Sequence, residues 1–224
     1  MQVLYEDNHL LAVNKPAGLA VQGDSTGDEH LLDLAALWLK NKYDKPGLAF
    51  VGLIHRLDRP VSGVVLLAKT SKGLSRMNEL FRSKNIRKIY HAISREQLAA
   101  EQGTLQHYLG KDAKTNRALT YLKPKEGAKP AVLHYRHLQA RNNLHLYEIE
   151  LETGRFHQIR AQMAKTGAPL LGDVKYGAGT PLPGREVALH ALKLEFKHPV
   201  TGEEIKITAP YPKSEWWQSF KSKP

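Results

Sequence analysis

The sequence predicts an α+β protein that folds as one compact domain, residues 1–224. Two observations support this class: short runs of alternating or continuously apolar residues are typical of strands, and apolar residues at helical spacing separate some of these runs. The length allows a substantial hydrophobic core. Neither an internal repeat nor a clear linker divides the chain, so one compact unit is expected.

The N-terminal part of the chain begins with two predicted strands. Residues 3–5 and 10–13 are short apolar runs, and Lys-Pro-Ala-Gly at residues 15–18 predicts a turn after the second run. Leucine, alanine and tryptophan then recur at helical spacing, which predicts a helix over residues 31–41.

The next elements surround a short charged segment. The apolar residues 50–54 lead into Asp58, which we therefore expect at the exit of a strand, and residues 64–67 predict another strand. Thr70 is a suitable N-cap for the helix that follows. That helix is predicted to bury one face, formed by Leu74, Met77 and Phe81.

The second half of the chain predicts a strand pair and then a helix. Residues 132–138 and 144–151 alternate in polarity and are joined by a turn at residues 141–143. Thr153 is predicted to cap the next helix, and Gly167 to end it. The apolar face of that helix contains Ile159 and Met163.

The charge of the chain favours a polyanionic partner. There are 33 Lys and Arg against 22 Asp and Glu, which gives a formal charge of +11 and a pI near 9.7. Nucleic acid is the leading candidate, because cationic side chains release counterions from phosphates on binding. The longest apolar stretch, residues 64–68, is too short to span a bilayer, and the first seven residues lack the pattern of a signal peptide. We therefore expect a cytoplasmic protein that does not bind membranes.

The absence of cysteine limits the chemistry that the protein can perform. It excludes disulfides, thiolate nucleophiles, iron–sulfur ligation and zinc sites that contain cysteine. The 11 histidines are scattered, and none of them forms a spaced metal-binding motif. No metal site is expected.

Two segments carry much of the positive charge. The first basic segment, residues 69–95, has eight Lys or Arg and one acid, Glu79, and the second basic segment, residues 111–129, has six Lys or Arg and two acids, Asp112 and Glu126. A solvated surface would explain either segment alone. Their joint occurrence, with aromatic residues among the charges, favours RNA binding.

The candidate catalytic residue is Asp58, in the segment His-Arg-Leu-Asp-Arg-Pro-Val-Ser-Gly at residues 55–63. Arg56 and Arg59 flank the carboxylate, which would lower its pKa and keep it ionised as a nucleophile or base. A strand-end aspartate that supports a turn explains this segment equally simply, and on this segment alone that structural role is favoured.

Several blocks together change this balance, because the chain resembles the RluA-type pseudouridine synthases along almost its whole length. Four blocks match the family in order: residues 14–18, residues 55–63 with Leu66, Ala68 and Lys69, residues 88–90, and residues 151–160. Further matches are residues 172–173, 176–177, 189–191, 198–199 and 201–203. The resemblance implies the pseudouridine synthase fold, a mixed and mostly antiparallel central sheet flanked by helices and loops around an active-site cleft. It also implies that no cofactor is needed to isomerise uridine to pseudouridine.

The resemblance implies roles for individual residues. Asp58 matches the catalytic aspartate, Tyr90 the tyrosine packed against the target base, and Arg160 the arginine that pairs with the aspartate. Arg56 matches the arginine that fills the gap left when the uridine swings out of the RNA stack. Without the resemblance, Tyr90 would be read as a core aromatic and Arg56 as a phosphate contact. The remaining expected RNA contacts are Arg59, Lys15, Arg155, Lys72, Arg76, Arg82 and Lys88.

The sequence also differs from the family and leaves other functions open. Many relatives have Thr at the positions of Val61 and Leu133, and the chain starts at the first catalytic-domain strand, without the small RNA-binding domain of some relatives. A tRNA or large-subunit rRNA stem-loop, bound by a monomer, is the expected substrate. The alternatives are a non-catalytic RNA-binding or chaperone protein, and a nucleoside or glycoside hydrolase, for which no second acid near Asp58 is apparent. Lys15 and Arg155 could also support the fold.

Overall fold

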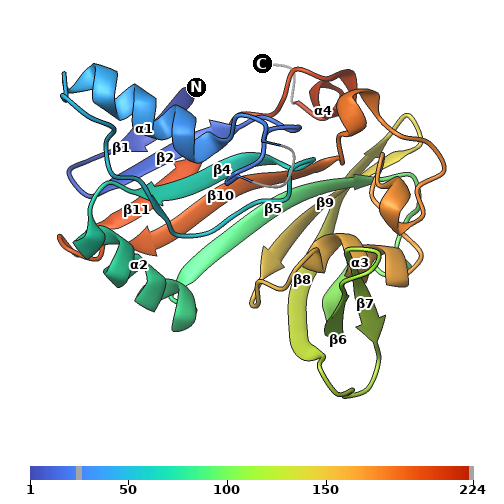
Figure 1. Ribbon diagram of the computed structural model, residues 1–224. Coiled ribbons are helices and arrows are strands. Elements are labelled where there is room, and N and C mark those ends of the chain that lie inside the picture. The colour runs from blue at the N-terminus through green and yellow to red at the C-terminus, as the bar shows by residue number, and fades with distance from the viewer. Residues whose placement is uncertain (24–26, 222–224) are drawn as a thin grey trace. The chain divides into compact units, whose positions relative to one another are not determined.

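A computed structural model describes residues 1–23 and 27–221 of the chain (Figure 1). The described residues contain eleven strands and four α-helices, so the predicted α+β class is confirmed. The chain divides into two compact units. Unit 1 is Met1–Arg87 with Ala191–Tyr211, and unit 2 is Lys88–His190 with Pro212–Pro224. The expectation of one catalytic domain over residues 1–224 stays a prediction.

The strands of unit 1 follow the order β1 (Gln2–Glu6), β2 (Leu10–Lys15), β4 (Ser62–Ala68) and β10 (Leu189–Lys197), with β3 (Gly52–Leu53) on β4 and β11 (Glu204–Thr208) on β10. The strand pairs β1–β2, β2–β4, β3–β4 and β10–β11 are antiparallel. Every residue of β4 is buried, as its continuous apolar sequence requires. The predicted strands at residues 3–5, 10–13 and 64–67 are therefore confirmed.

Two helices complete unit 1, α1 (Leu31–Lys42) and α2 (Ser71–Arg82). Both confirm the sequence prediction. The hydroxyl of Thr70 accepts a hydrogen bond from the backbone N–H of Gly73 at 3.0 Å, which is the expected N-cap. Leu74, Met77 and Phe81 pack on the core of unit 1. The exposed side of α2 consequently carries the charges of the first basic segment.

The strands of unit 2 form a continuous antiparallel series. Their order is β5 (Ile86–Ser94), β9 (Leu144–Leu151), β8 (Lys129–Arg141), β6 (Gln102–Asp112) and β7 (Arg117–Tyr121). The first two residues of β5 belong to unit 1. Asn142 and Asn143 join β8 to β9 with positive φ angles of 51° and 56°. This is the geometry of a two-residue type I′ turn, which asparagine tolerates well, and it confirms the predicted hairpin.

One face of β6 and β7 is covered by α3 (Gln158–Lys165). Ile159 and Met163 are buried, and Gly167 ends the helix with a φ of +87°, as predicted. The remaining elements of unit 2 are α4 (Glu215–Gln218) and two 3₁₀ turns, η1 (Val174–Tyr176) and η2 (Pro183–Arg185). Within residues 1–23 and 27–221, no helix is long and apolar enough to cross a membrane.

The prediction that Thr153 caps α3 was wrong. The helix starts at Gln158, and its N-cap residue is His157, whose φ is +51°. The Thr153 hydroxyl instead accepts a hydrogen bond from the N–H of Val132 at 2.9 Å and donates one to Oε1 of Gln158 at 2.8 Å. Because strand β8 already satisfies this hydroxyl, it does not cap the helix.

Candidate active site

Asp58 lies in the loop between β3 and β4 of unit 1. The carbonyl of Asp58 accepts a hydrogen bond from the N–H of Val61 at 3.0 Å, which closes a tight turn. The expected strand exit was wrong, because β3 ends at Leu53, five residues earlier. The N–H of Leu66 donates to Nε2 of His55 at 3.0 Å, so the backbone ladder between β3 and β4 stops there.

The predicted turn at residues 15–18 is hydrogen-bonded to the Asp58 loop. The N–H of Gly18 donates to the carbonyl of Arg59 at 2.8 Å, and Nε of Arg59 donates to the carbonyl of Gly18 at 2.9 Å. The guanidinium of Arg59 also pairs with Asp28. These bonds bring the first two sequence blocks together within unit 1.

Lys15 is the buried residue that connects these loops through hydrogen bonds. Its side chain is fully buried, and Nζ donates to the carbonyls of Pro16 at 2.9 Å, Leu19 at 2.8 Å and Arg59 at 3.2 Å. Burial lowers the pKa of Lys15 to about 7, against the opposite effect of the nearby Asp58 carboxylate. This geometry favours the alternative that Lys15 supports the fold over a direct contact with RNA.

The end of the loop requires a glycine. Gly63 has a φ of +117°, and a Cβ atom at this position would lie 2.3 Å from the carbonyl oxygen of Ala191. No side chain fits at that distance, so the start of β4 approaches β10 more closely than any other residue would allow. The Asp58 loop is thus fixed at both ends by main-chain contacts.

In unit 2, Tyr90 lies in the middle of β5, opposite Ile149 of β9, and is half-buried. Lys88 precedes it on the same strand and is also half-buried. Because Asp58 belongs to unit 1, the pairing of Tyr90 with the Asp58 site stays a prediction.

Arg160 forms a buried ion pair in unit 2. Its Nε lies 2.7 Å from Oδ2 of Asp173, and its Nη2 lies 2.9 Å from Oδ1. Both side chains are at most 5% exposed. This bidentate geometry fixes the guanidinium plane and uses two of its five N–H donors. The predicted pairing of Arg160 with Asp58 stays a prediction, because the two residues belong to different units.

Tyr176 lies beside this ion pair and is hydrogen-bonded to His157. The Arg160 guanidinium lies 5.1 Å from the ring centre of Tyr176. The Tyr176 hydroxyl is 2.8 Å from Nδ1 of His157 and accepts a hydrogen bond from the N–H of Ala118 at 2.6 Å. The blocks at residues 151–160, 172–173 and 176–177 are therefore assembled into one buried polar cluster within unit 2.

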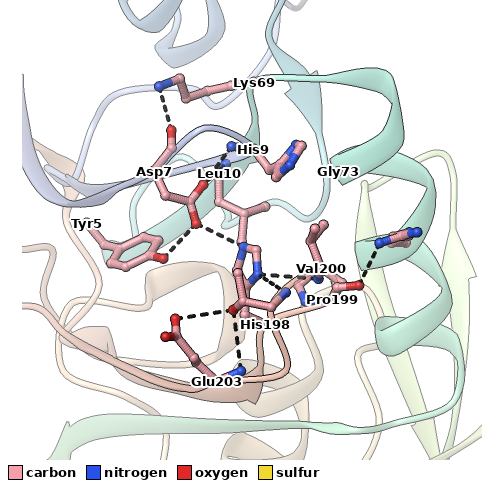
Figure 2. Close-up of polar contacts among 12 residues, drawn as sticks. Tyr5, Asp7, His9, Leu10, Lys69, Gly73, His198, Pro199, Val200 and Glu203 are labelled. Atoms are coloured by element: carbon pink, nitrogen blue, oxygen red, sulfur yellow. Dashed lines mark hydrogen bonds and ion pairs between the residues drawn. The ribbon is translucent and has the colours of Figure 1, made fainter.

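A second polar network lies in unit 1, around Asp7 (Figure 2). The Asp7 carboxylate accepts hydrogen bonds from the Tyr5 hydroxyl and from the N–H groups of His9 and Leu10 at 2.6–2.7 Å. Burial alone would raise the pKa of Asp7, but these donors lower it below its ordinary value. Nε2 of His198 lies 2.9 Å from Oδ2 of Asp7, a close electrostatic contact without good hydrogen-bond alignment.

The same network holds the start of α2. Nδ1 of His9 is 3.0 Å from the hydroxyl of Thr70, which caps the helix, and Nζ of Lys69 donates to the carbonyl of Asp7 at 2.6 Å. Arg76 donates to the carbonyl of Pro199 at 3.0 Å, next to His198. The match at residues 198–199 thus has a structural role, because the carbonyl of Pro199 accepts a hydrogen bond from α2.

Comparison with known proteins identifies the family. Residues 9–165 match the family described as RNA pseudouridylate synthase. The chain belongs to the RluA-type RNA pseudouridine synthases. Members of this family isomerise uridine to pseudouridine in RNA, and the chain is such an enzyme.

Individual relatives agree with this assignment. An uncharacterized RNA pseudouridine synthase, YhcT, of Bacillus subtilis is 36% identical over 95% of this chain and 69% of its own length. Ribosomal large subunit pseudouridine synthase D of Vibrio vulnificus is 33% identical over 95% and 67%. The structure of human RNA pseudouridylate synthase domain containing 4 superposes with a TM-score of 0.79 at 25% identity, and covers 95% of this chain and 89% of its own.

The predicted RNA contacts of the synthase differ in exposure. Arg56 and Lys72 are exposed, and neither makes a hydrogen bond or ion pair within the described residues. Arg82 is exposed and pairs with Glu79 of its own helix. Arg155 is half-buried and donates from Nε to the carbonyl of Pro130 at 2.9 Å, which favours a role in the fold. These residues remain predicted RNA contacts.

The sequence interpretation gave no role to two residues of the synthase. Asp173 is 1% exposed and is the carboxylate partner of Arg160. Gln158 is 3% exposed, and its amide accepts from Thr153 and from the N–H of Arg155 while donating to the carbonyl of Val132. Both lie in blocks that match the family, and a polar residue inside such a block was the signal available.

Proposed function

We propose that this synthase isomerises a uridine in ribosomal large-subunit RNA and that Asp58 is its catalytic carboxylate. The substrate assignment is supported by the relatives from Vibrio and Rickettsia, which are named ribosomal large subunit pseudouridine synthases D and C, at 33% and 35% identity. A tRNA stem-loop is the alternative substrate. The catalytic assignment is supported by the position of Asp58 in the His-Arg-Leu-Asp block, on a loop that main-chain bonds hold in place.

The isomerisation conserves atoms and needs no redox step. The bond between N1 of uracil and C1′ of ribose breaks, the base rotates, and C5 bonds to C1′. The proton on C5 then leaves, and N1 gains one. In this proposal Asp58 acts on the ribose or on the ring, Tyr90 packs against the base and relays the C5 proton, and Arg160 orients the carboxylate. Arg56 takes the place of the extruded uridine, since a planar cation can stack and donate hydrogen bonds there.

The test follows the C5 proton. Large-subunit rRNA and tRNA, each labelled with tritium at uridine C5, are incubated with the wild-type chain, with Asp58→Asn and with Asp44→Asn. Asp44 is an exposed acid of unit 1 with a φ of +48°, a conformation that asparagine tolerates, so it is a matched control. We expect release from rRNA with wild type and the control, and none with Asp58→Asn.

The outcomes separate the parts of the proposal. Release from tRNA and not from rRNA overturns the substrate. Release by Asp58→Asn at the wild-type rate overturns the catalytic role. RNA affinity of Asp58→Asn should stay near the wild-type value, because phosphate contacts supply most of the binding. Equal loss of affinity and activity would make Asp58 a binding or folding residue instead.

The proposal also includes the state in which the enzyme works, a monomer in the cytoplasm. Analytical ultracentrifugation at micromolar concentration should give the mass of one 25.2 kDa chain. Cell fractionation should place the enzyme with cytoplasmic RNA. A dimer mass, or enrichment in another fraction, would correct this part alone.

A further inference from the structure

The two basic segments differ in what their charges contact. In the first basic segment, at least three of the eight cations have carboxylate partners: Lys69 pairs with Glu6, Arg82 with Glu79, and Arg87 with Glu195. In the second, none of the six cations forms an ion pair within the described residues. The six are Lys111, Lys114, Arg117, Lys123, Lys125 and Lys129, and all are exposed. Their charge is therefore available to an anionic partner.

The acids of the second basic segment do little to offset these cations. Asp112 is used inside the β6–β7 turn, where it accepts hydrogen bonds from the N–H of Lys114 at 3.0 Å and from the hydroxyl of Thr115 at 2.6 Å. Glu126 is exposed in the loop before β8. The turn thus holds Lys114 in a defined position through its backbone while its ammonium group faces solvent.

Three of these cations are positioned over aromatic rings. Nζ of Lys111 lies 4.8 Å from the ring centre of Phe156, Nζ of Lys125 lies 4.5 Å from that of Tyr121, and the Arg117 guanidinium lies 5.2 Å from that of Tyr176. Cation–π contacts of this kind orient a charge without neutralising it. The segment therefore presents fixed, unneutralised positive charge.

Two of these three rings, Phe156 and Tyr176, have further contacts that leave little free surface for bases. Phe156 also stacks on His157, with ring centres 3.8 Å apart, and Tyr176 also contacts the Arg160 guanidinium at 5.1 Å. Single-stranded RNA is bound through open aromatic faces on which bases stack. A surface whose rings already hold cations is better suited to phosphates.

We propose that the second basic segment, residues 111–129, is the main phosphate-binding surface of the enzyme and that it holds the backbone of an RNA stem without reading its sequence. The stem is the duplex beside the target uridine, so the inference rests on the proposed function for its substrate. The RNA phosphates bind mainly to the β6–β7 turn and to the loop before β8. The helix α2, which the sequence favours, contributes less, because part of its charge is paired internally.

The test compares three variants that each remove three positive charges. The hairpin variant is Lys114→Gln, Lys123→Gln and Lys125→Gln. The helix variant is Lys72→Gln, Arg76→Gln and Arg82→Gln. The control variant is Lys45→Gln, Lys206→Gln and Lys213→Gln, three exposed lysines outside both segments. Equal loss of net charge separates a local surface from a general attraction.

Affinity is measured for a fluorescein-labelled 20-base-pair RNA duplex and for a large-subunit rRNA transcript, across a series of KCl concentrations. Each lost phosphate contact lowers the slope of log affinity against log salt by roughly 0.9, so the hairpin variant should lose roughly 2–3 from this slope. Its affinity should fall on the order of tenfold for both RNAs. The helix variant should lose less, and the control variant least.

Several outcomes would overturn the inference. One is a hairpin variant whose salt slope equals that of the control, which would make the segment a solvated face or a site for a protein. Another is a helix variant that loses as much as the hairpin variant. Loss confined to the rRNA transcript would show sequence reading instead of backbone binding. If the wild-type enzyme releases no tritium from rRNA but the duplex results hold, the substrate proposal fails and this one stands.

A conservative variant distinguishes the loss of charge from an effect on folding. Lys114→Arg, Lys123→Arg and Lys125→Arg keep all three charges, so the salt slope and the affinity should return to the wild-type values. Loss of affinity in this variant as well would mean that the segment acts through its structure. Circular dichroism and thermal unfolding of all variants accompany the binding data.

Discussion

The Asp58 loop of unit 1 and the start of α3 in unit 2 are fixed by different kinds of contact. The Asp58 loop is held by backbone groups: Lys15 donates to three carbonyls, and Gly63 approaches the carbonyl of Ala191. The start of α3 is held by side chains, above all by the ion pair of Arg160 with Asp173. Each region buries one cation: Lys15 donates to main-chain carbonyls, whereas Arg160 pairs with the carboxylate of Asp173.

This difference determines how each region should respond to substitution. Backbone contacts depend on the absence of a side chain or on one buried charge, so a single change is expected to disrupt the whole loop. Side-chain contacts are distributed over several residues, so each substitution is expected to cost a few kcal/mol or less. The following predictions test this contrast, from the largest expected effect to the smallest.

The largest effect is expected at Gly63. Gly63→Ala adds a Cβ atom 2.3 Å from a backbone oxygen at a φ of +117°, so it should destabilise the fold by about 4 kcal/mol or more. Gly18→Ala in the same site is the control, because Gly18 also has a positive φ, +87°, but open space around it. Urea unfolding of Gly18→Ala should show a decrease of about 1 kcal/mol in the free energy of unfolding. Equal losses at both glycines would contradict the role of close approach.

The second effect concerns the ion pair of unit 2. Asp173→Asn removes the carboxylate from a buried guanidinium, which should cost about 3 kcal/mol in the free energy of unfolding. Asp33→Asn is the control, since the Asp33 side chain is 67% exposed and should change stability by less than about 0.5 kcal/mol. A loss below about 1 kcal/mol at Asp173 would show that Arg160 does not depend on this partner.

The regular elements and the family could be predicted from the sequence, because local patterns determine them. The spacing of Leu74, Met77 and Phe81 identified α2, and the paired asparagines at 142 and 143 identified a hairpin turn. Such features involve neighbouring residues or matches in order along the chain.

Contacts that depend on tertiary packing could not be predicted in this way. Nothing in Asn-Lys-Pro distinguishes a buried Lys15 from an exposed one, and Arg160 and Asp173 are 13 residues apart in separate elements. Thr153 has the residue type of an N-cap, but strand β8 takes its hydroxyl, and the helix begins only after His157. The charge count of the first basic segment likewise does not reveal its ion pairs.

The third prediction uses the buried charge of Lys15. Its pKa is about 7 in the folded protein and 10.5 ordinarily, so between these pH values the unfolded chain binds more protons. The stability of the wild type should therefore rise as pH increases through this window. Lys15→Met removes this titration. The difference in unfolding free energy between the two proteins therefore reports Lys15 alone, because all other titratable groups are present in both. Between pH 7 and 10, the unfolding free energy of wild type should gain on the order of 3 kcal/mol relative to the variant. A difference that does not change with pH would mean that Lys15 titrates normally.

The smallest effect is expected at Thr153, and it tests whether unit 2 is indeed held by shared side-chain contacts. Thr153→Val removes the acceptor of the Val132 N–H and one hydrogen bond to Gln158, which should cost about 1–2 kcal/mol in urea unfolding. Thr180→Val, at an exposed position, should leave stability unchanged. Gln158→Leu, alone and combined with Thr153→Val, gives the coupling between the two residues, because partners in one network lose less together than the sum of the single losses. Strict additivity would mean that the two contacts are independent, and unit 2 would then resemble the Asp58 loop in relying on single contacts.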